Sequence, residues 1–276
     1  MTQHETSVAS VVLLDLVREI AVRAAEFALD ARRAGVSVEA TKSSAVDIVT
    51  AVDRDTETLI RSLILEARPD DGIVGEEEAR HVGTSGLDWI VDPIDGTVNF
   101  LYGIPAWAVS IAVAEGAADD GTGGRTVAGV VVNPVNGELF EASVDGGARL
   151  RGREMAVNTD VPLGEALVGT GFGYRAERRR EQAEVLLELL PQVRDIRRIG
   201  SASLDLCALA AGRLDAYYER GLNVWDHAAG ALIAREAGAR VAGVGGGVES
   251  KALIVAAAPG LYEELAAALR SAGLDA

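Results

Sequence analysis

The stretch WIVDPIDGTVNF, residues 89–100, decides the architecture expected for this chain. Its first three residues are apolar and predict a buried strand, but Asp92 and Asp95 follow at once, separated by Pro93 and Ile94. A turn stiffened by the proline would direct two carboxylates and the Ile94 carbonyl toward a common point. Such a cluster repels itself unless a cation is bound, and oxygen ligands without nearby cysteine or histidine favour Mg²⁺ or Mn²⁺ over zinc. Taken alone, however, the same pattern fits a capped turn ahead of a short helix better than a metal site.

Two further segments offer the same chemistry. VGEEEAR places Glu76, Glu77 and Glu78 directly after a short apolar segment, and NVWDHAAGALIAREAGA places Asp226 at the start of an amphipathic helix. Each has an ordinary alternative, because a run of glutamates is usually a solvated charge cluster and an aspartate at a helix start is usually an N-cap. Each alternative is the better interpretation of its own segment, but the recurrence of the same chemistry in three segments strengthens the case for a shared metal site.

Composition narrows the class of protein. The 276 residues suffice for one large domain or two closely joined ones, and 42 acidic against 26 basic residues give a net charge of −16. This charge repels polyanions and argues against nucleic-acid binding; the acidic excess fits solubility at least as well as metal binding. A single cysteine, Cys207, no leader pattern and no apolar stretch long enough for a bilayer predict a cytoplasmic protein without membrane segments.

Hydrophobic periodicity predicts interleaved helices and strands. Helices are expected at about residues 11–33, 46–67, 177–190, 203–211, 225–237 and 261–271. Strands are expected at 72–74, 89–91, 107–113, 126–132, 138–142, 166–171, 194–199, 214–218 and 252–256. Residues 117–124 read as an exposed hairpin loop and 243–250 as a flexible glycine-rich loop. The pattern is mixed α/β layering, not a strict βαβ repeat.

Three segments resemble, in their order along the chain, the signatures of the inositol monophosphatase family: GEE, WIVDPIDGTVNF and WDHAAGALIAREAGA. The members of this family are magnesium-dependent, lithium-sensitive phosphomonoesterases. The similarity extends to TKSSAVDIVTAVD (41–53), YGIPAWAVSIAV (102–113) and RRIGSASLDLCALAAGRLDAYYERG (197–221), so it covers nearly the whole chain. GTGFGYR (169–175) and RRIGSASLDLC look closest to the bacterial branch. The resemblance implies an α/β fold, the layered α-β-α-β-α sandwich of the inositol monophosphatase and fructose-1,6-bisphosphatase type. It also implies a homodimer of single units spanning 1–276, with a metal-site half at about 1–150 and a substrate-side half at 151–276.

The resemblance also assigns roles to matching positions. Glu76, Asp92 and the Ile94 carbonyl would bind a first Mg²⁺; Asp92, Asp95 and Asp226 would bind a second, and a third, weaker ion would lie near Glu76 through waters. Mn²⁺ would substitute and Li⁺ would inhibit. Thr97 and Asp53, with Glu76 beside them, would orient the attacking water, and the backbone N–H groups of Gly96 and Thr97 would bind phosphate at the start of a short helix. Asp95, Ala202 and Glu219 would contact the polyol, Gly200 and Ser201 would line its wall, and Glu76, Ile94 and Asp226 would also border the substrate. Lys42 and Glu77 would have secondary roles.

The implied reaction is hydrolysis of inositol 1-phosphate to myo-inositol and phosphate by direct attack of water. An aspartyl-phosphate intermediate is disfavoured, because such enzymes carry Asp-X-Asp after a strand, whereas Asp92 and Asp95 have two residues between them. Departures from the family, EAGAR at 236–240 and VAGVGGGVES at 241–250, leave the outer pocket and substrate open. Fructose 1,6-bisphosphate, histidinol phosphate or a 3′-phosphoadenylyl nucleotide are alternative substrates, and a non-catalytic regulatory binding protein is an alternative of another class.

Overall fold

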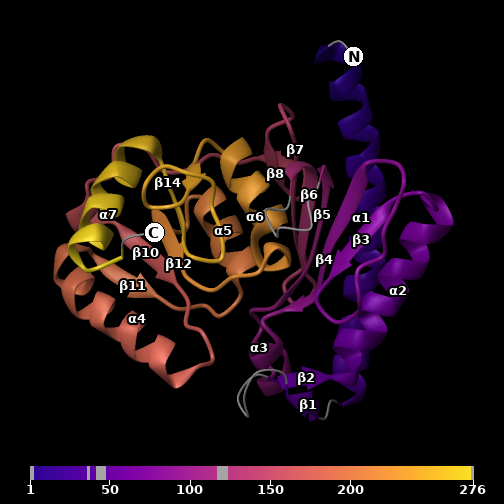
Figure 1. The fold of residues 1–276 in the computed structure, drawn as a ribbon, viewed down its shortest axis with the longest axis horizontal. Helices are drawn as coiled ribbons and strands as arrows, with labels where there is room; N and C mark the ends of the chain where they lie inside the picture. Colours follow the sequence, from indigo (N-terminus) through magenta and orange to yellow (C-terminus); the bar gives the residue numbers. More distant parts are fainter. Residues whose placement is uncertain (1–2, 36–37, 42–47, 117–123, 275–276) are drawn as a thin grey trace.

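A computed structural model describes residues 3–35, 38–41, 48–116 and 124–274 of the chain (Figure 1). Its strands form a large sheet, a smaller sheet and a separate two-stranded ribbon. The ribbon pairs β1 (Val38–Thr41) with β2 (Ile48–Thr50) in antiparallel orientation.

The larger sheet has seven strands in the order β3-β4-β5-β6-β7-β8-β9. They are β3 (Gly72–Gly75), β4 (Leu87–Asp95), β5 (Ala108–Glu115), β6 (Arg125–Asn133), β7 (Glu138–Ser143), β8 (Ala148–Leu150) and β9 (Arg153–Glu154). β3 runs parallel to β4, and each later strand pairs antiparallel with the one before it. β4, β5 and β6 are buried on both faces, which explains their nearly continuous apolar sequences.

The smaller sheet has five strands in the order β11-β10-β12-β14-β13. They are β10 (Leu167–Thr170), β11 (Asp195–Arg197), β12 (Ala216–Glu219), β13 (Arg240–Ala242) and β14 (Ile254–Ala257). β10 is parallel to β11 and β12, whereas β14 is antiparallel to β12 and β13.

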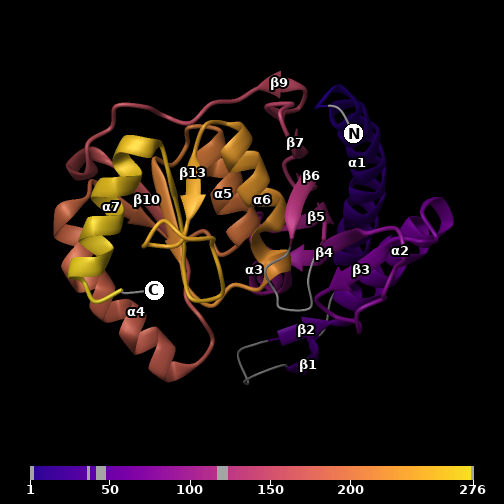
Figure 2. The ribbon, with the colours of Figure 1, turned by 45° about the horizontal axis from the view of Figure 1, so that its top comes forward.

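Helices separate and cover the two sheets (Figures 1 and 2). α1 (Gln3–Ala34) and α2 (Ala51–Ala67) cover the outer face of the larger sheet, and α4 (Ala176–Leu189) and α7 (Pro259–Ser271) cover the smaller one. α5 (Ala202–Ala210) and α6 (Val224–Glu236) lie between the sheets, and the short α3 (Thr97–Tyr102) follows β4. Short 3₁₀ turns occupy Leu163–Glu165 and Leu190–Gln192. The layered α-β-α-β-α sandwich is therefore confirmed.

The middle layer depends on small residues where α6 meets β6. A Cβ built on Gly129 of β6 would lie 3.0 Å from the Cα of Ala229 in α6, so the helix and strand backbones approach closely there. Ala229 is 1% exposed, and the surrounding residues of α6 are largely alanine and glycine. The position of the α6 axis over the larger sheet is therefore set by backbone contact, and Asp226 near its N-terminus is placed with it.

Most predicted elements are confirmed to within a few residues, but three boundaries differ. α1 begins at Gln3, eight residues before the predicted start at residue 11. β4 does not end at Val91; it continues to Asp95 with an irregular register between Asp92 and Asp95, where Pro93 has no N–H for the ladder. α2 starts at Ala51 instead of about 46, because Thr50 is its N-cap.

Short elements went unpredicted. β1, β2, β8, β9 and β13 each have two to four residues, too few for a recognisable period. Residues 117–123 of the predicted hairpin loop lie outside the described residues. None of the helices in the described part of the chain combines the length and hydrophobicity needed to cross a lipid bilayer.

Candidate metal and phosphate site

The end of β4 carries the paired aspartates in a buried turn. Asp92 is 1% exposed, and its Oδ1 accepts a hydrogen bond of 3.1 Å from the backbone N–H of Ile94. Asp92, Ile94 and Asp95 lie together at the irregular end of β4, with Pro93 between the first two.

Gly96 connects this turn to α3. Its φ of 96° lies in the left-handed region, and a Cβ on it would be 3.1 Å from the carbonyl oxygens of both Ala106 and Gly200. Backbone conformation and close contact each require glycine at this position. The Gly200 contact also brings the chain before α5 against the start of α3.

Thr97 and Asp53 lie together, as predicted. The Thr97 hydroxyl is 3.1 Å from Asp53 Oδ1 and 3.1 Å from the Ile94 carbonyl oxygen, and its single proton can be donated to one of them at a time. The other oxygen of Asp53, Oδ2, accepts the backbone N–H of Thr50 at 2.9 Å and its hydroxyl at 2.5 Å. The buried Asp53 is therefore oriented by the capping box of α2 with one oxygen directed to Thr97.

Asp95 is bound to the N-terminus of α5. Its Oδ2 accepts hydrogen bonds from the Ser201 hydroxyl (2.6 Å), the Ser203 N–H (2.7 Å) and the Ser203 hydroxyl (2.5 Å). Burial raises the pKa of Asp95, and these hydrogen bonds act in the opposite direction. Asp95, at the end of β4 in the larger sheet, is thus held by α5, the helix that precedes β12 of the smaller sheet.

Asp226 belongs to a capping box at the start of α6, but it is not the N-cap. The N-cap is Asn223, whose N–H donates to Asp226 Oδ2 at 2.6 Å. The sequence alternative of an Asp226 N-cap is therefore wrong by three residues, and Asp226 is the third residue of the helix. Burial, followed by the negative charges of Glu76 and Asp95, raises the pKa of Asp226 well above its usual range. Asp226 therefore lies within the electrostatic reach of two other predicted ligands.

Glu219 ends β12 on the substrate side of the predicted site. Its Oε2 accepts a hydrogen bond of 2.6 Å from the Tyr217 hydroxyl, and a Cβ on Gly171 would lie 2.0 Å from the same oxygen. Burial raises the pKa of Glu219 to about 7, although the Tyr217 hydrogen bond lowers it. A side chain at position 171 would therefore displace this carboxyl group.

Three structurally important residues, Asn99, Asp205 and Glu57, were not predicted from the sequence. The Asn99 amide in α3 donates to the carbonyls of Ala106 (2.7 Å) and Ile199 (2.9 Å), which joins α3 to the loop before α5. Asp205 of α5 is buried with Oδ1 lacking a hydrogen-bond partner, and burial, followed by the charges of Glu219 and Asp95, raises its pKa well above the usual range. Glu57 lies four residues after Asp53 in α2, and that helical spacing was the one signal that could have indicated it.

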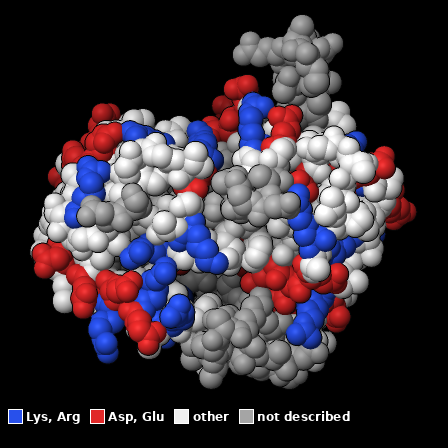
Figure 3. All heavy atoms as spheres, viewed as in Figure 1, with Lys and Arg blue, Asp and Glu red and all other residues white. Residues whose placement is uncertain are grey.

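The remaining predicted residues fall at the edges of this site. Ala202 begins α5, with Gly200 and Ser201 directly before it, and Glu76 follows β3. Glu77 donates its N–H to Glu57 Oε2. Lys42 lies outside the described residues. Figure 3 shows a group of acidic side chains to the lower right of the centre of one face.

The donor set fits a hard divalent cation. It consists of buried or half-buried carboxylates and one backbone carbonyl, and the mutual repulsion around Asp226 is the kind that a cation would offset. Within the described ranges, no three Asp, Glu, His or Cys side chains form a group arranged to bind a metal ion. The metal site therefore stays a prediction.

The chain matches the inositol monophosphatase family over residues 11–274. It is 49% identical over 263 residues to inositol-1-monophosphatase SuhB of Mycobacterium tuberculosis strain H37Rv, across 90% of this chain and 87% of that protein. It is 38% identical over 254 residues to Nus factor SuhB of Pasteurella multocida, across 89% and 92%. The structure of extragenic suppressor protein suhB from Bartonella henselae has a TM-score of 0.86 at 35% identity, covering 94% of this chain and 98% of that one. The similarity extends from within α1 to the end of α7 and beyond.

Proposed function

The chain belongs to the inositol monophosphatase family, and on that premise we propose that it hydrolyses inositol 1-phosphate to myo-inositol and phosphate with bound Mg²⁺. The observations that support this most are the Thr97 hydroxyl within hydrogen-bond distance of Asp53 and the Ile94 carbonyl, and the raised pKa of Asp226 in the field of Glu76 and Asp95. Phosphate-monoester hydrolysis is slow enough to need acceleration of up to about 10²¹-fold, more than one acid or base can supply.

In this proposal Glu76, Asp92 and the Ile94 carbonyl would hold one ion, and Asp92, Asp95 and Asp226 would hold a second. Glu76 would also lie near a third, more loosely bound ion. When bound, such ions lower the pKa of an attacking water and neutralise charge on the phosphoryl oxygens. The residues of the chain orient the reactants.

Thr97 and Asp53 position the attacking water. When the Thr97 hydroxyl donates its proton to Asp53, the lone pairs of the Thr97 oxygen are left to accept a hydrogen bond from water. The capping box of α2 keeps Asp53 oriented. Backbone N–H groups of Gly96 and Thr97 bind the phosphate. No covalent phosphoenzyme is needed for this direct displacement.

Glu219 and the start of α5 receive the polyol. The Glu219 carboxyl lies beside Tyr217, and Asp95 is fixed by Ser201 and Ser203 at the same helix N-terminus that presents Ala202 and Gly200. Carboxyl groups and backbone amides of this kind suit hydroxyl-rich substrates.

The test is phosphate release by the purified full-length protein from a panel of phosphate esters, with Mg²⁺ or with EDTA. We expect the highest kcat/KM for inositol 1-phosphate and loss of turnover in EDTA, with Mn²⁺ partly replacing Mg²⁺. A clear preference for fructose 1,6-bisphosphate, histidinol phosphate or a 3′-phosphoadenylyl nucleotide would reject the substrate but keep the reaction class.

Li⁺ sensitivity is a further part of the proposal. Li⁺ would compete with the more loosely bound Mg²⁺, so millimolar inhibition should weaken as the Mg²⁺ concentration rises. Unchanged turnover at tens of millimolar Li⁺ would count against this second ion site.

A regulatory role is the second candidate, because one similar protein is named a Nus factor. The two candidates differ in phosphate release with Mg²⁺: a protein that only binds partners would show none.

Homodimer formation is also proposed, and light scattering should then give twice the chain mass of 28.7 kDa.

A further inference from the structure

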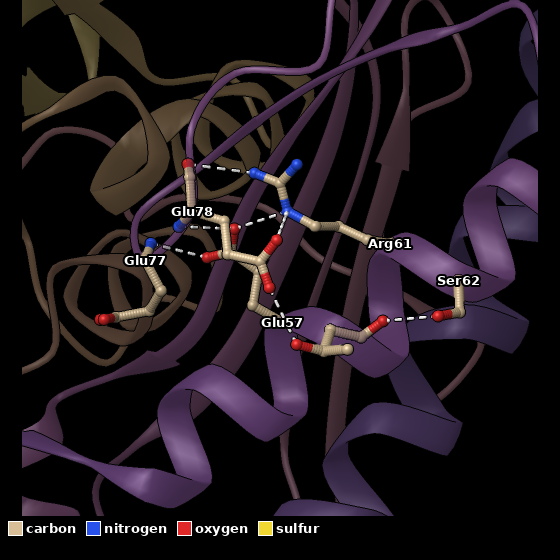
Figure 4. Close-up of polar contacts among 6 residues, drawn as sticks. Glu57, Arg61, Ser62, Glu77 and Glu78 are labelled. Atoms are coloured by element: carbon tan, nitrogen blue, oxygen red, sulfur yellow. Dashed lines mark hydrogen bonds and ion pairs between the residues drawn. The ribbon is translucent and has the colours of Figure 1, made fainter. Parts of the chain in front are cut away.

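Glu57 is a fully buried glutamate of α2 whose two oxygens are both occupied by the loop that follows β3. Its Oε2 accepts the N–H of Glu77 at 2.7 Å, and its Oε1 accepts the N–H of Glu78 at 3.1 Å. Figure 4 shows the side chains of Glu57 and Arg61 directed from α2 toward this loop. The loop backbone is therefore bound to α2 at the two residues after Glu76.

Arg61 completes the attachment from the other side. Its Nε donates to Glu57 Oε1 at 2.8 Å, and its terminal nitrogen donates to the Glu78 carbonyl at 3.1 Å. The Thr58 hydroxyl also donates to Glu78 Oε1 at 2.8 Å. The negative charge of Glu57 is thus balanced in the interior, and the loop is bound through both its donors and its acceptors.

Gly75 extends the contact to the residue before Glu76. A Cβ on Gly75 would lie 2.1 Å from Glu57 Oε1, so the backbone passes directly over the carboxylate. Glu76 therefore lies between a residue packed on Glu57 and a residue hydrogen-bonded to it.

We propose that Glu57 is a positioning residue that sets the place of Glu76 in the metal site, with Arg61 as its partner. The inference rests on the proposed function only in treating Glu76 as a metal ligand. A carboxylate is needed because three N–H donors converge on its two oxygens, and an amide would turn a donor toward at least one of them. Glu57 acts through Glu76 and does not itself contact substrate.

The test compares Glu57→Gln with Glu141→Gln in the full-length protein. Glu141 is also a buried glutamate, 6% exposed, whose Oε2 pairs with Arg18 Nε at 2.5 Å, but it joins β7 to α1 and lies outside the site. Titration calorimetry with Mg²⁺ alone and the Mg²⁺ concentration for half-maximal turnover are the readouts.

We expect Glu57→Gln to weaken Mg²⁺ binding by about tenfold or more, with KM for inositol 1-phosphate at saturating Mg²⁺ changed less than threefold. Glu141→Gln should lower thermal stability without changing Mg²⁺ affinity. Gly75→Ala, which pushes the loop away from an intact Glu57, should weaken Mg²⁺ binding in the same direction and serves if Glu57→Gln does not fold.

Folded Glu57→Gln or Gly75→Ala protein with Mg²⁺ affinity within twofold of the parent overturns the inference, as does an equal loss in Glu141→Gln. If the parent protein itself neither binds Mg²⁺ nor releases phosphate, the proposed function fails instead. The two failures are therefore distinguishable.

Discussion

Asp226 combines a capping hydrogen bond with a negative charge, and one substitution separates them. In Asp226→Asn the amide oxygen can still accept the Asn223 N–H, so stability in EDTA should be unchanged or slightly raised as repulsion from Glu76 and Asp95 is relieved. The neutral amide is a poor ligand for a hard cation, so we expect turnover to fall by at least about a hundredfold. Thermal unfolding and phosphate release measure the two effects.

The matched control for this variant is Asn223→Ala. It removes the capping side chain but keeps the backbone N–H that binds Asp226, and should cost roughly 0.5–2 kcal/mol of stability with turnover largely retained. Near-normal turnover in a folded Asp226→Asn protein would return Asp226 to a purely structural role.

Glu219 predicts a pH-dependent stability. Its pKa in the folded protein is about 7 because burial disfavours the charged form. Between its ordinary pKa and about 7 the folded state retains a proton that the unfolded state has released, so the unfolding free energy falls as pH rises through this window. Glu219→Gln should match the parent near pH 4.5 and exceed its stability near pH 8 by roughly 1–3 kcal/mol.

Denaturant unfolding in EDTA at both pH values measures this difference. Glu184→Gln, which alters an exposed glutamate of α4, should leave the pH dependence unchanged. A Glu219→Gln protein with the same stability difference from the parent at both pH values would contradict the assignment.

Single residues also show the limit of sequence reasoning. The roles of Thr97 and Asp53 were predicted by resemblance, because Asp53 lies in the motif TKSSAVDIVTAVD and Thr97 lies in WIVDPIDGTVNF. Glu57 was missed because its partners are backbone N–H groups 20 and 21 residues away, and its spacing of four from Asp53 indicates only a shared helix face. The N-cap at Asn223 was missed because aspartate suits both the N-cap and the third helical position of a capping box.

At the scale of elements, Gly96 joins β4 to α3. In Gly96→Ala the positive φ costs about 1–2 kcal/mol, and contact with the carbonyls of Ala106 and Gly200 adds roughly 1–3 kcal/mol. The junction that presents Thr97 should also shift, so turnover should fall more than stability alone explains.

Gly86→Ala is the control for this substitution. Gly86 has a φ of 84° but open space around its Cβ position, so only the conformational cost of about 1–2 kcal/mol applies. Equal losses of unfolding free energy in the two variants would show that the carbonyls of Ala106 and Gly200 move aside at no measurable cost.

Elements with a strong period were predictable, and those fixed by tertiary contacts were not. The amphipathic helix over 11–33 and the apolar strands of the larger sheet were recognised from sequence alone. The continuation of β4 to Asp95 depends on pairing with β5 beyond a proline, and β13 exists because β14 offers it a partner. Pairing of this kind is decided by distant strands and leaves little trace in a short segment.

At the scale of the whole molecule, the proposed metal site joins residues from the two halves of the chain. Asp92 and Asp95 come from the half that forms the larger sheet, and Asp226 comes from the half that forms the smaller sheet. If Mg²⁺ binds the folded state alone, a concentration one hundred times its Kd adds about 2.7 kcal/mol to the unfolding free energy. The Tm should therefore rise by several degrees with Mg²⁺ and return to its starting value with EDTA.

Asp226→Asn should lose most of this Mg²⁺-dependent increase, whereas Glu141→Gln should keep it. An unchanged Tm across Mg²⁺ concentrations that support turnover would show that the ion does not stabilise the junction between the halves.

The middle layer has a consequence for how the protein is made. The inner face of the larger sheet carries apolar residues such as Ile90, Val131 and Phe140, and the helices that bury it, α5 and α6, come from later in the chain. During synthesis this sheet face stays uncovered until the ribosome has released α6, which also brings Asp226. A nascent chain therefore exposes an apolar surface that favours aggregation, and it acquires its last proposed metal ligand in the same step that covers that surface.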